Sequence, residues 1–158
     1  MFAVEIFPGP RTELLSLFHE SDDSSTAIEA YIDQGEVLVA RNKQGRVIGH
    51  IQLIESPMEW EIKSLAVAQL WRGQGIGSAL MHAALERARS KGAIRVAVAT
   101  ATADIGNIRF YQRLGFRMHR IEPDAFTRER GYSNTSVGGI PVRDRVWFSL
   151  EFRPGRQE

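Results

Sequence analysis

Residues 61–78 read EIKSLAVAQLWRGQGIGS and combine strand composition, a short loop and the start of a helix. Within the loop, Gly73, Gly75 and Gly77 alternate with other residues, so the backbone can turn tightly there. Such a loop presents consecutive backbone N–H groups, and the following helix brings the positive end of its dipole to the same place. The stretch therefore predicts a binding site for a phosphate group.

The loop differs from the two best-known phosphate loops. A Walker loop ends in Gly-Lys-Ser/Thr, whereas Gly77 is followed directly by Ser78 with no lysine between them. The dinucleotide fingerprint needs a further glycine, which would fall at Ser78 or at Leu80. The pattern that fits is Arg/Gln-x-x-Gly-x-Gly/Ala, which is filled by Arg72, Gly75 and Gly77.

A second pattern lies further along the chain. Residues 107–116 read NIRFYQRLGF, which predicts a helix that carries a tyrosine and ends in Leu-Gly-Phe. This pattern begins about 35 residues after Arg72, with a helix pattern and a strand pattern in between. Together the two patterns resemble the signatures of the GCN5-related N-acetyltransferase (GNAT) superfamily, over roughly residues 36–152. Alone, the first pattern also fits a glycine-rich turn before an ordinary amphipathic helix.

The hydrophobic pattern divides the chain into alternating elements. It predicts helices over residues 11–20, 75–90 and 104–114, and another helix that begins near the cap candidates of residues 22–25. It predicts strands over residues 2–7, 36–41, 46–54, 59–67, 94–99, 116–121 and 145–152. The stretch between residues 121 and 145 is loop-like. These elements imply an α+β domain with a mixed sheet.

The resemblance implies a more specific fold and function. The expected fold is a GNAT-like α+β domain of the three-layer type over residues 1–158, with a mixed, mostly antiparallel central sheet flanked by about four helices. The expected activity is direct transfer of acetyl from acetyl-CoA to a primary amine of a small molecule or peptide, with no metal. The last third of the sequence resembles that of a bacterial branch of small acetyltransferases. The alternative is a CoA-binding or acyl-CoA-binding sensor without turnover.

The resemblance also implies a cofactor site. In the family, loop amides hold the pyrophosphate of coenzyme A, and amides at the end of the preceding strand hold the thioester carbonyl. The residues that correspond here are Leu65, Ala66, Val67, Arg72, Gly73, Gln74, Gly75, Ile76, Gly77 and Ser78. Many relatives carry an asparagine seven residues before the tyrosine, whereas this chain has Asp104 there and Asn107 four residues before Tyr111. We therefore expect Asn107 to contact the cofactor and Asp104 to cap its helix.

The chemistry of acetyl transfer gives Tyr111 a role. When an amine attacks a thioester, negative charge forms first on the carbonyl oxygen and then on the departing sulfur, so an N–H donor and a proton donor are needed. The resemblance assigns the second task to Tyr111. A tyrosine pKa of about 10 exceeds a thiol pKa of about 8.5, so a hydrogen bond alone can suffice. The alternative is that Tyr111 is a core aromatic residue like its neighbour Phe110.

The strand over residues 59–67 carries acidic side chains. Strict alternation predicts one face with Glu59, Glu61, Lys63, Leu65 and Val67. Related acetyltransferases place a catalytic base on this strand, eleven residues before the Arg/Gln of the loop, and Glu61 has that spacing from Arg72. A carboxylate there would accept the proton of an incoming ammonium group. The alternative is an ordinary ion pair of Lys63 with Glu61 or Glu59.

Acceptor recognition is expected in the loop-like stretch that begins at residue 121. The acceptor-side candidates are Glu59, Asp124, Tyr132 and Asp144. Residues 143–145 could equally form a structural ion-pair cluster. The sequence leaves the identity of the amine open, because acceptor specificity lies in the loops.

Composition sets broader limits. The chain of 158 residues is 43% hydrophobic and 25% charged, and contains no cysteine, which excludes disulfides, thiolate metal sites and a cysteine nucleophile. Residues 1–5 lack the features of a signal peptide and no long apolar run is present, so we expect a cytoplasmic protein without a membrane partner. Residues 146–150 are strongly β-forming and would either be buried within the sheet or offer an edge for a homodimer.

The net charge of +1 conceals an asymmetry. Residues 1–70 carry 5 Lys or Arg against 11 Asp or Glu, a balance of −6, whereas residues 71–158 carry 15 against 8, a balance of +7. One interpretation is a basic surface beside the phosphate loop and an acidic surface for a cationic amine; the other is a mixed solvated surface. Without a lysine-rich stripe or alternating aromatic and basic residues, nucleic acid is not an expected partner.

Overall fold

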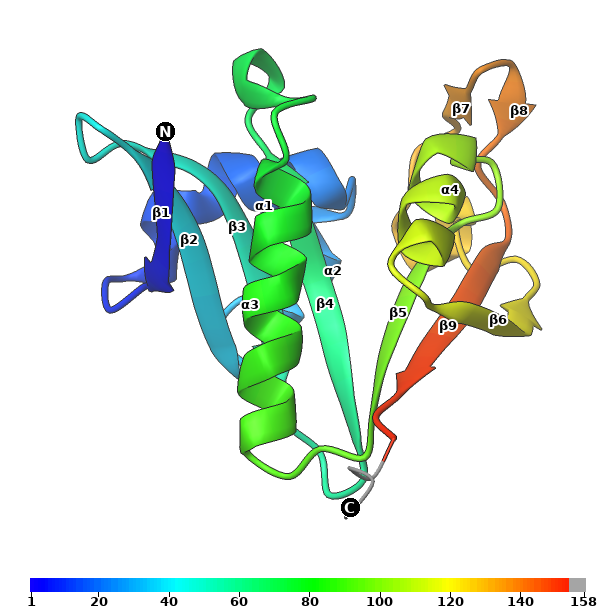
Figure 1. Ribbon diagram of the computed structural model, residues 1–158. Helices are drawn as coiled ribbons and strands as arrows, with labels where there is room; N and C mark the ends of the chain where they lie inside the picture. The colour runs from blue at the N-terminus through cyan, green and yellow to red at the C-terminus, as the bar shows by residue number, and fades with distance from the viewer. Residues whose placement is uncertain (154–158) are drawn as a thin grey trace.

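The computed structural model describes residues 1–153, whose main sheet has seven strands (Figure 1). They follow the order β1-β2-β3-β4-β5-β9-β6, and every neighbouring pair is antiparallel except β4 and β5. The strands of this sheet are β1 (Phe2–Ile6), β2 (Glu36–Asn42), β3 (Val47–Ile54), β4 (Glu59–Val67), β5 (Arg95–Ala101), β6 (Arg117–Glu122) and β9 (Arg145–Glu151). A separate hairpin consists of β7 (Ser136–Val137) and β8 (Ile140–Pro141).

Helices cover both faces of the sheet. They are α1 (Leu15–Ser21), α2 (Ser25–Tyr31), α3 (Ile76–Ser90) and α4 (Ile105–Arg113). On one face, Leu80 and Ala84 of α3 belong to a buried cluster with sheet residues such as Ile51. On the other face, Phe18 of α1 and Ile28 of α2 belong to a second cluster. The prediction of an α+β fold with a mixed, mostly antiparallel sheet and four helices is confirmed (Figure 1).

Local sequence signals explain most helix starts. The N–H of Ala27 donates to Ser24 Oγ over 3.2 Å at the start of α2, within the predicted cap region. The N–H of Asn107 donates to Asp104 Oδ1 over 3.0 Å at the start of α4, so Asp104 caps its helix as predicted. Helix α3 begins after Gly75, whose φ of +82° is a left-handed conformation that favours glycine.

The predicted helix over residues 11–20 is wrong in its first half. Arg11–Leu14 is a short 3₁₀ helix, and α1 begins only at Leu15. The reason is a tertiary contact, because the Arg11 guanidinium donates to the carbonyls of Ile32 over 2.9 Å and Gln34 over 2.6 Å. These bonds hold residues 11–14 against the segment that follows α2, so these residues do not continue α1.

The sheet splits between its two parallel strands. β4 pairs with β5 only where Glu59–Ile62 face Arg95–Val98. Beyond these pairs β4 continues against β3 as far as Val67, while β5 continues against β9 as far as Ala101. In Figure 1 the two strands meet near the bottom of the view and diverge toward the top. Residues of both strands line a cleft at this divergence.

A β-bulge in β4 overturns the predicted alternation. Gln52 pairs with Ser64 and Leu53 pairs with Ile62, which leaves Lys63 without a partner. The extra residue reverses the side-chain direction beyond it, so Leu65 packs with Ile62 in the cluster beneath α3. Lys63 remains on the opposite face, with its Nζ 4.9 Å from the ring centre of Tyr31 in α2. The five residues predicted to share a face therefore lie on both.

The last strand occupies an internal position. β9 lies between β5 and β6, so residues 146–150 are buried within the sheet as predicted, and the idea of a dimer edge at β9 is wrong. The stretch expected to be a loop from residue 121 contains the end of β6, a 3₁₀ helix (Arg128–Arg130) and the β7–β8 hairpin. Among residues 1–153, none of the helices has the length and apolar character needed to cross a bilayer.

Candidate active site

A cleft of about 1170 Å³ passes through the split in the sheet. On the α3 face it is lined by the loop between β4 and α3 and by α4, from residues that include Arg72, Gly75, Gly77, Asn107 and Tyr111. On the opposite face it is lined by the junction of α1 and α2 and by the segment before β9, from residues that include Ser21, Asp22, Tyr31, Phe126 and Tyr132. The walls thus come from opposite faces of the sheet.

The glycine loop offers free backbone donors. Gly73 and Gly75 have φ angles of +76° and +82°, and a Cβ added at either position would meet no atom within 4 Å. Helix α3 has no side-chain cap, and its first internal bond is from Ala79 N–H to the Gly75 carbonyl, over 3.0 Å. The N–H groups before Ala79 therefore lack helical partners, in an open space at the positive end of the helix dipole. This arrangement fits an anionic phosphate.

Arg72 has a structural role in the loop as well as a place in the cleft. Its Nε donates to the carbonyl of Val67 over 3.0 Å, and its guanidinium pairs with Glu20 of α1. These contacts fix the loop against the end of β4 and against α1. Among the predicted loop residues, Gln74 lies outside the cleft lining.

Backbone groups of β4 face the split. The N–H of Ala68 donates to the carbonyl of Ile48 in β3 over 2.8 Å. Because backbone direction alternates along a strand, the N–H of Ala66 also faces β3, whereas the N–H groups of Leu65 and Val67 face the opening. All three predicted residues line the cleft, but only Leu65 and Val67 offer a backbone donor to it.

Tyr111 reaches the cleft from the core. Its side chain is 5% exposed and lies among the rings of Phe110, Phe116 and Phe148, with ring centres 5.4 to 6.0 Å away. Burial raises the pKa of Tyr111, and the negative charge of Asp104 adds to the effect. The phenol therefore keeps its proton at neutral pH and can donate a hydrogen bond.

Glu61 lies on the opposite face of the cleft. Burial raises the pKa of this carboxyl, the positive charges of Lys63 and Arg145 oppose the shift, and Glu59 adds to it. Lys63 Nζ lies 3.8 Å from Glu61 Oε1, so the ion pair considered as an alternative is present as a long contact. Both side chains line the cleft, where Glu61 can take up a proton.

Three of the four predicted acceptor-side residues lie outside the cleft lining. Glu59 pairs with Arg95 Nε over 2.8 Å. Asp124 accepts from Arg143 Nε over 2.6 Å, and Asp144 Oδ1 accepts from the N–H of Asp124 over 2.9 Å. These bonds build the turn that leads into β9. Of residues 143–145, Arg143 pairs with Asp124 and Arg145 pairs with Glu122, whereas Asp144 accepts from a backbone N–H.

Tyr132 is the acceptor-side candidate that lines the cleft. Its ring packs edge to face on Phe126, with ring centres 5.0 Å apart. Burial raises the pKa of Tyr132, and the charge of Asp22 contributes in the same direction. Tyr132 therefore forms part of an aromatic wall beside Asp22 and Asp23, which lie between α1 and α2.

Several other cleft residues escaped the sequence analysis. Tyr31, at the end of α2, donates through its hydroxyl to Asp22 Oδ2 over 2.9 Å. Trp147 and Arg145 of β9 also line this wall, although they lie more than a hundred residues from Tyr31 along the chain. Only the strand order could have brought them together, and the sequence carries no local signal for it.

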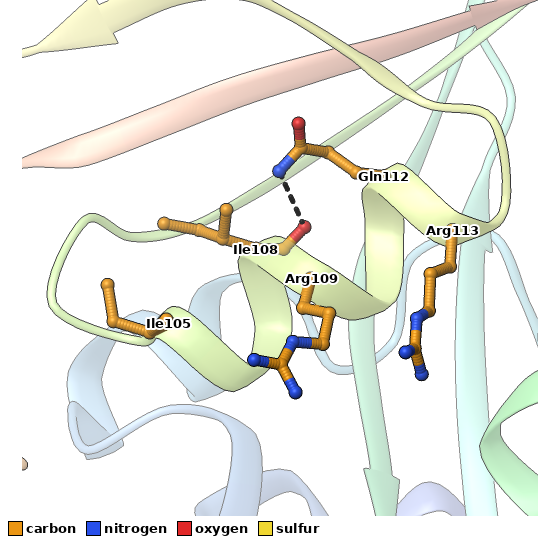
Figure 2. Close-up of a pocket in the computed structure, with 5 residues that line it drawn as sticks. All are labelled: Ile105, Ile108, Arg109, Gln112 and Arg113. Atoms are coloured by element: carbon orange, nitrogen blue, oxygen red, sulfur yellow. Dashed lines mark hydrogen bonds between the residues drawn. The ribbon is translucent and has the colours of Figure 1, made fainter.

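A smaller hollow lies on the outer side of α4. Figure 2 shows its five lining residues, Ile105, Ile108, Arg109, Gln112 and Arg113, and the bond from the Gln112 amide to the carbonyl of Ile108, over 3.4 Å. Arg113 lines both this hollow and the main cleft. Within residues 1–153, no three carboxylate or imidazole side chains gather as ligands for a metal ion.

Comparisons with known proteins agree with this geometry. The curated relative YvbK of Bacillus subtilis, an uncharacterized N-acetyltransferase, is 28% identical over 148 residues, which cover 94% of this chain and 95% of the relative. The IAA acetyltransferase of Bacillus cereus ATCC 14579 has a solved structure that is 31% identical, with a TM-score of 0.87, over 96% of this chain and 100% of that chain.

A GNAT family acetyltransferase from Elizabethkingia anophelis, solved with acetyl-CoA bound, is 25% identical with a TM-score of 0.85, over 96% of this chain and 98% of that chain. The sequence model of the Acetyltransferase (GNAT) family matches residues 5–116, which is more than half of the protein. These residues include the glycine loop, the split strand β4 and the helix that carries Tyr111. The chain therefore belongs to the GNAT acetyltransferase family.

Proposed function

We propose that the protein is an acetyl-CoA-dependent N-acetyltransferase that transfers acetyl directly to a primary amine of a small molecule or peptide. One observation carries the proposal: a single cleft connects a loop suited to phosphate with an opposite wall that holds carboxylates and aromatic rings. The family supports the reaction class, and the Elizabethkingia anophelis relative with bound acetyl-CoA supports the cosubstrate.

The cosubstrate would be held by backbone groups. The N–H groups at the start of α3 would bind its phosphates, and the residues that would hold them are Arg72, Gly73, Gly75, Ile76, Gly77 and Ser78. When bound, acetyl-CoA supplies an acetyl group activated as a thioester. Asn107 of α4 would also contact the cosubstrate. Its side-chain amide donates to Thr100 Oγ1 over 3.2 Å at the cleft wall.

The chain supplies donors for the charge that develops. The N–H groups of Leu65 and Val67 face the split and would stabilise negative charge on the carbonyl oxygen. The phenol of Tyr111, protonated because it is buried, would donate to the departing sulfur. Since these donors are fixed by strand pairing and by aromatic packing, they need little rearrangement during the reaction.

The opposite wall would receive the amine. Glu61 would accept a proton from the ammonium group, and its raised pKa makes it a stronger base than an exposed glutamate. Asp22 and Asp23 add negative charge to this wall, and Tyr31 and Tyr132 provide flat surfaces. A cationic amine with apolar parts suits this environment.

Isothermal titration with acetyl-CoA and with CoA tests the cosubstrate site. Gly75→Glu should abolish binding, because it places a strained, negatively charged residue where phosphate would bind. Gly92→Glu is the matched control, since Gly92 has a φ of +87° and open space around a built Cβ, but lies beyond the far end of α3. Unchanged binding in Gly75→Glu, or no binding by the unmodified protein, would overturn the proposed site.

Transfer itself is measured as amine-dependent release of free CoA thiol, with mass spectrometry of the acetylated product. A panel should contain small diamines, amino sugars, amino acids and peptides with free N-termini. Direct transfer predicts that acetyl-CoA alone leaves no acetyl group on the protein. Thioester cleavage that no amine accelerates would contradict the proposed reaction.

A further inference from the structure

A chain of polar side chains runs from the protein core into the acceptor wall of the cleft. His50 Nε2 lies 2.8 Å from Ser64 Oγ, and Ser64 Oγ lies 2.6 Å from Ser21 Oγ. Ser21 Oγ lies 3.0 Å from the carbonyl of Phe18, to which it donates. His50 is fully buried and Ser64 is 4% exposed, whereas Ser21 is exposed, and both serines line the cleft.

Counting protons fixes the direction of the chain. If Ser21 donates to the Phe18 carbonyl, Ser64 must donate to Ser21, and His50 must donate from Nε2 to Ser64. This direction forms three hydrogen bonds and leaves the buried Nδ1 of His50 as an acceptor without a partner among the described residues. The reverse direction forms two bonds and buries an unpaired Nδ1–H, so it is less favourable.

The direction has a chemical consequence at the cleft. Every hydroxyl proton in the chain is already engaged along it, so Ser21 and Ser64 can present only oxygen lone pairs to a ligand. Protonation of His50 would not reverse this direction, because an imidazolium also donates from Nε2. The imidazole packs on the ring of Phe18, with ring centres 4.4 Å apart. Burial there lowers its pKa to about 3 and keeps it neutral. The serine pair is therefore selective for a group that donates N–H.

We propose that Ser21 and Ser64 bind an N–H of the acceptor amine, and that His50 is a positioning residue that holds their hydroxyl groups in the accepting orientation. This rests on the proposed acetyl transfer and assigns the amine a place within that site. Ser64 immediately precedes Leu65, whose N–H faces the split, and it lies on the same face as Lys63. An amine held there would lie next to the strand end where the thioester carbonyl is expected.

Steady-state kinetics with an amine acetylated by the unmodified protein tests the contact. Ser21→Ala and Ser64→Ala should each lower kcat/KM for the amine about tenfold, the effect of losing one hydrogen bond to a cationic group. The affinity for CoA, measured by titration, should stay unchanged. Ser16→Ala, an exposed serine on the same helix outside the cleft lining, is the matched control and should behave like the unmodified protein.

His50 is tested by a pair of substitutions and by spectroscopy. His50→Leu should lower kcat/KM about as much as Ser64→Ala, whereas His50→Gln retains an N–H donor and should restore most of it. Nitrogen NMR of the imidazole should show a proton on Nε2 and none on Nδ1, whatever the activity. A proton on Nδ1 would overturn the assigned direction.

The outcomes separate this inference from the proposed function. Full activity in Ser21→Ala and Ser64→Ala, beside an active unmodified protein, would overturn the serine contact and leave acetyl transfer standing. Loss of CoA affinity in Ser64→Ala would show that the serine acts on the opposite wall, and would also overturn it. If the unmodified protein binds CoA but acetylates no amine in the panel, the proposed transfer fails, and the amine site fails with it.

Discussion

The two walls of the cleft are built in different ways. The cofactor wall comes mainly from one loop and the helix after it, and presents backbone N–H groups to the ligand. The acceptor wall comes from α1, α2, β4, β9 and the segment between β6 and β9, and presents side chains. A wall of backbone groups suits a constant ligand, because substitutions of neighbouring side chains leave the amides in place. A wall of side chains from five segments can change its specificity one residue at a time.

The largest expected effect sharpens this comparison at Tyr111. Tyr111→Phe removes the phenol but keeps the ring among its aromatic neighbours, so we expect kcat to fall about a hundredfold with little change in CoA affinity. Rapid-quench kinetics and titration separate the two quantities. Tyr132→Phe, on the opposite wall, should affect kcat less. Unchanged kcat in Tyr111→Phe would favour the core-aromatic interpretation. If Tyr111→Phe abolished acetyl transfer but left the protein's function in the cell intact, the sensor alternative would be favoured.

The second prediction concerns the pH dependence of stability that arises from His50, behind the acceptor wall. His50 is neutral when folded because burial lowers its pKa from 6.5 to about 3, so the unfolded chain binds a proton first as pH falls. The free energy of unfolding should therefore decrease between pH 6.5 and pH 3, by up to about 1.4 kcal/mol per pH unit from this group. Urea titrations across this range should lose that slope in His50→Gln. An identical slope in both proteins would contradict it.

The third prediction tests whether the walls act independently. Tyr132→Ala removes a ring that packs on Phe126 and lines only the acceptor wall, so KM for the amine should rise about tenfold. CoA affinity should not change, because Tyr132 packs on Phe126 and not on the glycine loop between β4 and α3. Parallel measurement of both constants decides the question. A loss of CoA affinity would show that the walls are coupled through the split.

The smallest expected effect lies away from both walls. Glu36 of β2 accepts from Arg87 and from Lys91 Nζ, the latter over 2.9 Å, and these bonds lower its pKa from 4.5 to about 2. The resulting stabilisation is present above pH 4.5 and is lost as pH falls to about 2. Glu36→Gln should reduce stability by about 1 kcal/mol near neutral pH, as measured by thermal unfolding at low salt. Altered kinetics would contradict its placement outside the active site.

The difference between the walls also explains what could be predicted. Gly75 and Tyr111 could be found because each belongs to a short pattern whose spacing alone carries the information. The bulge at Lys63 could not be predicted, because the sequence of β4 shows a regular alternating pattern. The extra residue appears only in the pairing of β4 with Gln52 and Leu53 of β3.

Glu61 and Tyr132 of the acceptor wall were candidates from the sequence, but the rest of this wall was not predicted, for a related reason. Asp22 had a local explanation as a helix-cap candidate, and the place of Asp22 and Tyr31 beside Arg145 depends on the strand order. Asp124 and Asp144 looked suitable because they are polar loop residues. The structure instead uses their hydrogen-bonding capacity to hold a turn.

The position of β9 within the sheet has a consequence for the order in which the protein folds during synthesis. β2, β3 and β4 pair in sequence order, so this part of the protein can form while the rest is still being synthesised. β6 pairs only with β9, and β5, which can pair with β4, gains its second partner only when β9, the last strand of the described residues, is present. On the ribosome, the glycine loop would emerge early, but the cleft would be completed only when residues 145–151 leave the exit tunnel.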